Sequence, residues 1–153
     1  MTDCIGKCID KLSNEELYQI TNNVHKTLTH PKGNKLFAMY LAQFPDRLAC
    51  LNVYNTCSKY LDEERNQSIA GNSSEESLET LITKVEMIKE TVDDMDEIDL
   101  SLMKQFKDAL ETKTKIALLT VLENTQAQCQ RSLSGKIHER FVDHILQSKS
   151  TCT

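Results

Sequence analysis

The sequence predicts an all-α fold of six or seven amphipathic helices joined by short connections. Apolar residues recur at helical spacing along almost the whole chain. Only four glycines and two prolines interrupt its 153 residues. Neither strand-like alternation nor an Asn-Gly hairpin turn is present. This length suits one domain, which we expect over residues 13–150, after an N-terminal extension over residues 1–12.

The first predicted helix starts at a capping box, in which Ser13 and Glu16 each accept a backbone N–H group. Its apolar stripe consists of Leu12, Leu17, Ile20, Val24 and Leu28. Pro31 and Gly33 then interrupt the chain, and Gly33 is expected to let two helices approach closely. A second stripe therefore begins after this break.

Six further stripes complete the predicted bundle. They consist of Leu36, Phe37, Tyr40, Leu41 and Phe44; Leu48, Leu51, Tyr54, Cys57 and Leu61; Leu78, Leu81, Ile82, Val85, Ile88 and Val92; Leu102, Phe106 and Leu110; Ile116, Leu119, Leu122, Cys129 and Leu133; and Ile137, Phe141 and Ile145. Pro45, a polar loop over residues 66–74, an acidic turn over residues 93–99 and Gly135 mark connections between them. The acidic turn lacks the Gly and Glu positions of a calcium-binding EF-hand loop.

Composition excludes several classes of protein. The formal net charge is −5, so the chain lacks the basic footprint of a nucleic-acid-binding protein. It contains no apolar run long enough for a membrane span and no secretory signal at Met1. We therefore expect a cytoplasmic protein that is not integral to a membrane. Because the domain fills almost the whole chain, a stand-alone module is expected.

The cytoplasm is reducing and disulfides are rare there, so we do not expect the cysteines to form a disulfide framework. Cys50, Cys57 and Cys129 are expected to be small apolar residues on helix faces. Cys4 and Cys8 share one helical face, and reversible lipidation of this pair would give weak peripheral membrane contact. The plainer interpretation of residues 1–12 is a frayed extension.

Motifs that carry catalysis or bind cofactors are absent from the sequence. It has no HExxH motif, no Cys–His pair at catalytic spacing and no glycine-rich phosphate loop. No metal site and no cofactor are predicted. An all-α chain without a catalytic constellation favours a protein-interaction module over an enzyme.

Two blocks of the chain resemble the regulator-of-G-protein-signalling (RGS) homology domain, nearest the type found in G-protein-coupled receptor kinases. The first block, residues 31–60, carries Pro31, Gly33, Leu36, Phe37 and Tyr40, and then Pro45, Leu51, Tyr54, Cys57 and Tyr60. The second block, residues 119–143, carries Leu122, Leu133, Gly135, Ile137, His138, Arg140, Phe141 and Val142. Between them, Ile98, Asp99 and Leu100 stand where the family has a V-N-L segment that opens a helix. The resemblance covers residues 13–150 and implies an RGS-type helical bundle.

The resemblance also implies a function. Typical members bind an activated Gα subunit and hold its switch segments in the transition-state arrangement, without supplying a catalytic group. Here the positions that match the family's contact residues hold Cys50, Asp99, Lys136 and Arg140, of which only Arg140 fits the pattern. Cys50 cannot bond as an amide does, Asp99 lacks the donors of Asn, and Lys136 reverses an acidic charge. The resemblance therefore implies a Gα or related signalling partner with weak or absent stimulation of GTP hydrolysis.

Two alternatives remain open. One is a globin-like fold without haem, because the positions that align with the haem ligands hold Leu81 and either Phe106 or Leu110, not His. The other is a scaffold or adaptor with no link to G proteins. A groove containing Tyr18, Met39 or Met103 would indicate that it binds a partner helix.

Overall fold

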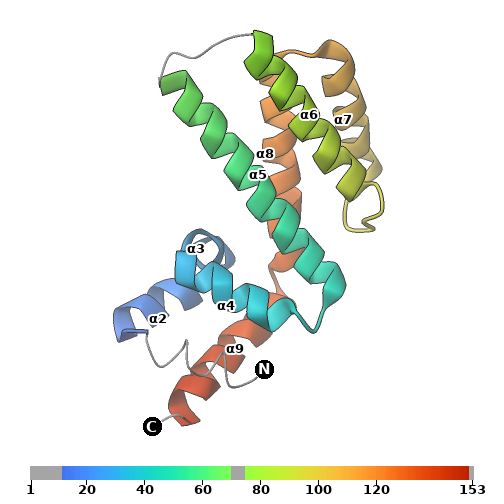
Figure 1. Ribbon diagram of the computed structural model, residues 1–153. Helices are drawn as coiled ribbons and strands as arrows, with labels where there is room; N and C mark the ends of the chain where they lie inside the picture. The colour runs from blue at the N-terminus through green and yellow to red at the C-terminus, as the bar shows by residue number, and fades with distance from the viewer. Residues whose placement is uncertain (1–11, 70–74, 152–153) are drawn as a thin grey trace. The chain divides into compact units, whose positions relative to one another are not determined.

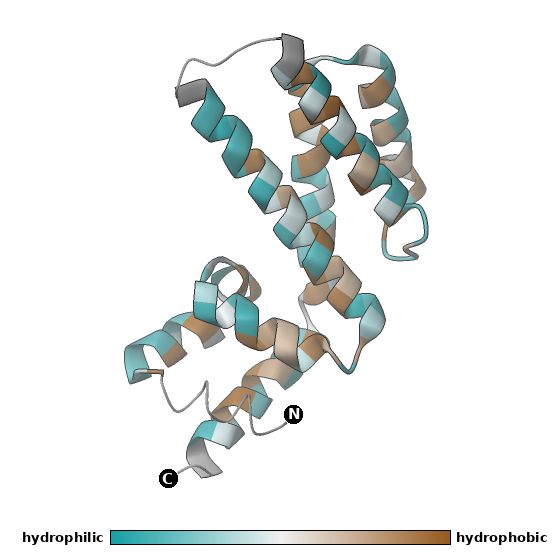
Figure 2. Ribbon diagram, viewed as in Figure 1, coloured by the Kyte–Doolittle hydropathy of each residue, from teal (hydrophilic) through white to brown (hydrophobic). Residues whose placement is uncertain are grey.

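The computed structural model describes residues 12–69 and 75–151, and all regular structure within these ranges is helical (Figure 1). The predicted all-α fold class is therefore confirmed. The helices are α2 (Asn14–Thr21), α3 (Val24–Thr29), α4 (Pro31–Leu41), α5 (Pro45–Ile69), α6 (Glu75–Val92), α7 (Leu100–Thr112), α8 (Lys115–Leu133) and α9 (Lys136–Thr151). Figure 2 shows apolar and polar residues sharing single helices, as the amphipathic pattern predicts.

The chain divides into two compact units. Within the described residues, unit 1 contains residues 12–48 together with residues 130–151, and unit 2 contains residues 49–69 and 75–129. Unit 1 thus combines two segments that are far apart in the chain.

In unit 1, the stripe expected to form one helix forms two, α2 and α3. The predicted capping box is present: Ser13 Oγ accepts from the Glu16 N–H at 3.1 Å, and Glu16 Oε1 accepts from the Ser13 N–H at 3.2 Å. A second cap then follows, where Asn23 adopts an extended backbone and its Oδ1 accepts from the Lys26 N–H at 2.8 Å. Asn23 therefore starts a new helix within an uninterrupted apolar stripe.

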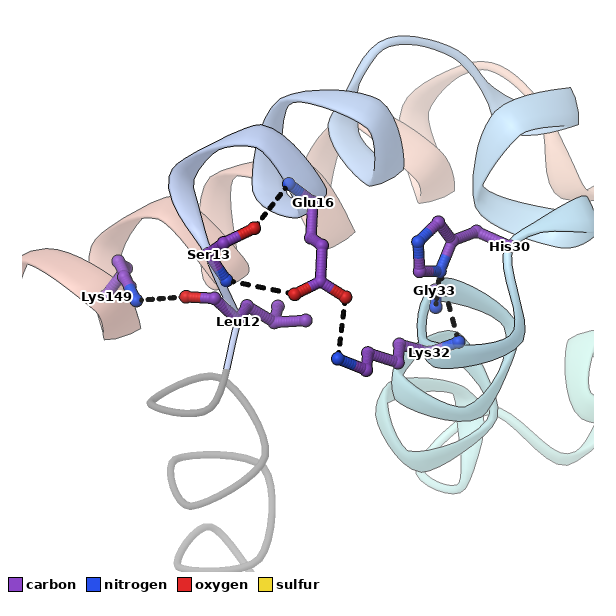
Figure 3. Close-up of polar contacts among 7 residues, drawn as sticks. All are labelled: Leu12, Ser13, Glu16, His30, Lys32, Gly33 and Lys149. Carbon is purple, nitrogen blue, oxygen red and sulfur yellow. Dashed lines mark hydrogen bonds and ion pairs between the residues drawn. The ribbon is translucent and has the colours of Figure 1, made fainter.

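The break predicted at Pro31 is confirmed, since Pro31 is the first residue of α4. His30 caps this helix: its Nδ1 accepts from the backbone N–H groups of Lys32 at 3.2 Å and Gly33 at 3.4 Å (Figure 3). Gly33 does not interrupt the chain, however. It lies within α4 and is buried, because α4 approaches the α2–α3 pair closely at this point.

Two polar links join the start of α2 to other helices of unit 1 (Figure 3). Lys32 Nζ lies 2.6 Å from Glu16 Oε2, so that the capping residue of α2 is also paired with the first turn of α4. The hydrogen bond from Lys32, followed by that from Ser13, lowers the pKa of Glu16 to about 2. Lys149 Nζ of α9 donates to the Leu12 carbonyl oxygen at 2.9 Å.

The core of unit 1 is an aromatic cluster contributed by α4 and α9. The rings of Phe37 and Phe141 are fully buried, with their centroids 4.7 Å apart. Tyr40 contacts Phe141 at 5.7 Å and His144 at 5.5 Å between centroids. Such contacts between large rings stabilise a bundle in which no Trp is present.

Unit 2 consists of α6, α7 and most of α5 and α8, and consecutive helices run in opposite directions (Figure 1). Its interior holds fully buried side chains from all four helices, namely Leu51, Leu81, Val85, Leu102, Phe106, Leu118 and Leu122. Polar links join neighbouring helices at the surface: Lys84 of α6 pairs with Glu63 of α5 at 2.5 Å, and Asn124 of α8 donates to Gln105 of α7 at 2.7 Å. The acidic segment over residues 93–99 forms the predicted connection between α6 and α7.

Candidate partner-binding surfaces

The contact residues suggested by the resemblance fall in both units. Cys50 and Asp99 belong to unit 2, whereas Lys136 and Arg140 belong to unit 1. Within unit 1, Lys136 and Arg140 stand four residues apart on α9 and are both exposed. They therefore occupy one side of that helix and are available to a partner.

Cys50 differs from the other three because its side chain has no exposed surface. It lies in the interior of unit 2, where its thiol is hydrogen-bonded to that of Cys129. A partner that docks on the folded unit does not reach this thiol. Cys50 is therefore a core residue, and the expectation that it contacts a partner does not fit its position.

Asp99 is exposed and serves as the N-cap of α7. Its Oδ1 accepts from the Leu102 N–H at 2.8 Å, and its own N–H donates to Gln128 Oε1 of α8 at 3.3 Å. One carboxylate oxygen is thus engaged in capping the helix. The expectation from the resemblance that Ile98, Asp99 and Leu100 open a helix agrees with this geometry.

The three described cysteines are buried, as predicted. Burial raises the pKa of the Cys57 thiol to about 12. The hydrogen bond to Cys50, and then burial, raise the pKa of Cys129. The Cys57 and Cys129 thiols are therefore protonated and unreactive at neutral pH. The candidate lipidation pair, Cys4 and Cys8, lies outside the described residues.

An apolar groove lies between α5 and α6 in unit 2, with a volume of about 340 Å³. Its lining consists of Ala49, Asn52, Val53, Thr56, Tyr60, Met87, Ile88 and Thr91. Met87 is 55% exposed, which makes it an accessible, adaptable apolar side chain. None of Tyr18, Met39 and Met103, which the sequence suggested for a groove, is among these residues. Tyr18 is exposed on α2, while Met39 and Met103 are half-buried on α4 and α7.

A second pocket lies between α5 and α8 of unit 2 and has a volume of about 250 Å³. Its lining consists of Leu61, Glu64, Arg65, Leu119, Glu123 and Gln126. Glu64 is buried, which is unusual for a carboxylate. Nothing in the sequence pattern singled out this residue, because it stands among other charged residues near the end of a long helix.

Three further observations bear on function. Within residues 12–69 and 75–151, no cluster of three or more His, Cys, Asp and Glu side chains has the arrangement needed to hold a metal ion. No helix in the same ranges combines the length and apolarity needed to cross a membrane. The residues that align with a globin haem pocket, Leu81 and Phe106, are buried in unit 2, and Leu110 is half-buried on α7.

Comparison with known proteins identifies no relative: no family model, no curated protein and no solved structure matches the chain.

Proposed function

We propose that this chain is a protein-interaction module of RGS type that binds a Gα subunit, or a related signalling protein, and stimulates GTP hydrolysis weakly or not at all. The observation that carries the proposal is that the two blocks of the resemblance, which are far apart in sequence, pack against each other. In unit 1, Phe37 of the first block and Phe141 of the second form the closest ring pair of the aromatic core.

The same two blocks also meet in unit 2. There the Cys50 thiol of the first block is hydrogen-bonded to Cys129 of the second, and Gln126 Nε2 donates to Ser58 Oγ. In each unit, therefore, residues of the first block contact residues of the second block. This supports treating the blocks as parts of one folded pattern and not as two chance matches.

The polar residues explain why stimulation would be weak. Asp99 offers only acceptors, Lys136 carries the charge opposite to that of the family's acid, and buried Cys50 offers no contact. Each lost polar contact costs about 1–3 kcal/mol. Losing three would leave an interaction that does not hold the switch segments of Gα in the transition-state arrangement. Arg140 remains exposed and able to bond a carboxylate.

Single-turnover GTP hydrolysis with a panel of Gα subunits tests this proposal. The unmodified chain should leave the hydrolysis rate almost unchanged. A double variant, Asp99→Asn with Lys136→Asp, restores two of the three differing residues and should increase stimulation. Asn caps a helix about as well as Asp, so α7 should be preserved in the variant. Several-fold acceleration by the unmodified chain would contradict the claim of weak activity.

A second candidate function is that of an adaptor that binds a partner helix, and the α5–α6 groove favours it. The groove is mostly apolar and displays Met87, a residue type that adapts to different helices. A helical peptide with a leucine stripe should then perturb the amide resonances of Thr56 and Ile88. Substitution Met87→Asp should abolish these shifts, whereas substitution of exposed Tyr18 in the other unit should not.

A further inference from the structure

Glu64 carries a carboxylate on an almost fully buried side chain. Its side chain is only 5% exposed, although it lies in a helix rich in charged residues. A buried carboxylate is strongly unfavourable unless it is paired with a cation and hydrogen-bonded. The partners of Glu64 therefore decide what this position can do.

The ion pair in the structure compensates Glu64 only in part. Lys115 Nζ, at the start of α8, lies 3.9 Å from Glu64 Oε2, which is beyond hydrogen-bond distance. The Lys115 side chain is itself 43% exposed. A loose contact with a half-solvated ammonium leaves the carboxylate able to accept a stronger hydrogen-bond donor.

The α5–α8 pocket lies directly beside this carboxylate. Its volume of about 250 Å³ is several times the share of a single water molecule, which is about 30 Å³. Leu61 and Leu119 supply apolar walls, and Glu123 and Gln126 supply polar atoms. Because the amide nitrogen of Gln126 donates to Ser58, its oxygen is the atom that remains as an acceptor.

Charge in the pocket favours a cation. Its lining contains two carboxylates, Glu64 and Glu123, and one guanidinium, Arg65. Arg65 lies 3.4 Å from Asp62 and is 72% exposed, so its charge is shared with a residue outside the pocket. A cationic group that enters would find acceptors on both helices, and the leucines would cover an aliphatic stem.

We propose that the α5–α8 pocket binds an arginine side chain of a protein partner, with Glu64 as its principal anion. The planar guanidinium can bond Glu64 and still present donors to Glu123 or Gln126, which a compact ammonium does less well. Ile116 is 81% exposed and lies one turn before Leu119 on α8, which gives the partner an apolar contact beside the pocket. This site is separate from Asp99, Lys136 and Arg140, so the inference stands without the RGS-type proposal.

Titration of the full chain with N-acetyl-arginine methylamide, followed by amide resonances, tests the site. Saturable shifts are expected at Leu119, Glu123 and Gln126. The citrulline analogue has the same shape without the charge and should not bind, and the lysine analogue should bind more weakly. Absence of saturable shifts, equal binding of citrulline, or tighter binding of lysine would each overturn the proposal.

Single substitutions test whether Glu64 is the anion that binds the arginine probe. Glu64→Gln should weaken binding of the arginine probe by at least about tenfold, because a charge-assisted hydrogen bond is lost. Glu111→Gln on α7 removes an exposed carboxylate outside the pocket and should change nothing. Unchanged affinity in a folded Glu64→Gln protein would refute the assignment. If that variant does not fold, Glu123→Gln at the exposed rim decides instead, with several-fold weakening expected and unchanged affinity contradicting the site.

Discussion

The single hydroxyl proton of Thr27 fixes the hydrogen-bonding role of His138 in unit 1. Thr27 Oγ1 lies 2.5 Å from the Ile20 carbonyl oxygen, which can only accept, so the hydroxyl donates there. His138 Nε2 lies 2.7 Å from the same hydroxyl oxygen. The imidazole must then donate through Nε2–H, and the buried pair joins α3 to α9.

Removing that hydroxyl should destabilise the protein more than an equivalent change at the surface. Thr27→Val keeps the side-chain shape but leaves the Nε2–H of buried His138 without its acceptor, which should lower the free energy of unfolding by about 1–3 kcal/mol. Thr29→Val, also in α3, removes an exposed hydroxyl that bonds the His25 carbonyl and should have little effect. Urea unfolding of both variants measures the difference, and equal losses would contradict the buried role of Thr27.

The same histidine should make stability depend on pH. Burial lowers the pKa of His138 below its ordinary value of 6.5, against a smaller opposing effect of Glu139. The unfolded chain therefore binds a proton more readily than the folded chain, and the free energy of unfolding should fall as pH drops below 6.5. His138→Gln keeps an N–H donor but does not titrate, so the decrease should become smaller. An unchanged pH profile in this variant would contradict the assignment.

Burial of single residues was predictable where it followed local spacing. Cys57 and Cys129 were expected to be core residues, and they are. The bond between Thr27 and His138 spans 111 positions, so no local pattern could predict it. For Cys50, helical spacing predicts a core residue, whereas the resemblance predicts a contact residue. Its complete burial agrees with the prediction from spacing.

Among the elements, α4 illustrates why a glycine occurs within a helix. A Cβ atom on Gly33 would lie 2.7 Å from the Thr27 carbonyl oxygen and 3.2 Å from two atoms of Ile20. The backbone oxygen cannot rotate away as a flexible side chain can. The packing of α4 on α2 and α3 therefore depends on the missing side chain.

Gly33→Ala should destabilise the protein by about 1–3 kcal/mol, although Ala favours an isolated helix by about 1 kcal/mol. Gly135 provides a contrast: it has a φ of +79°, and an added Cβ would meet nothing within 4 Å. Asn tolerates this left-handed backbone, so Gly135→Asn should cost less than Gly33→Asn. Thermal unfolding compares the two, and the reverse order would contradict the role of close packing at Gly33.

Helix boundaries were predictable where the sequence contains a capping box, a proline or a glycine that ends a helix. The capping box at Ser13 and the breaks at Pro31 and Gly135 appear as expected. The boundary between α2 and α3 was missed because Leu17, Ile20, Val24 and Leu28 keep helical spacing across it. The signal that could have revealed it is Asn23, a favoured helix-capping residue.

The buried face of α8 differs from the predicted stripe. Ile116 was expected in that stripe, yet it is 81% exposed, and Leu118 is buried instead.

For the molecule as a whole, periodicity predicted the fold class but not which stripes meet. A stripe shows which face of a helix is buried, whereas its partner depends on the tertiary arrangement. Two features depend on the tertiary arrangement in this way: the contact of Phe37 with Phe141, and the burial of Glu64 beside the α5–α8 pocket. Both features join segments that are far apart in the chain, so local spacing did not indicate either.

The central proposal is that the folded chain binds Gα through exposed residues such as Arg140. Retention on immobilised Gα subunits, loaded with GDP and aluminium fluoride as a transition-state mimic, tests it most directly. The unmodified chain should be retained, a folded Arg140→Glu variant should not, and a Glu111→Gln variant serves as the unaffected control. Failure of the folded, unmodified chain to bind any Gα in the panel would contradict it.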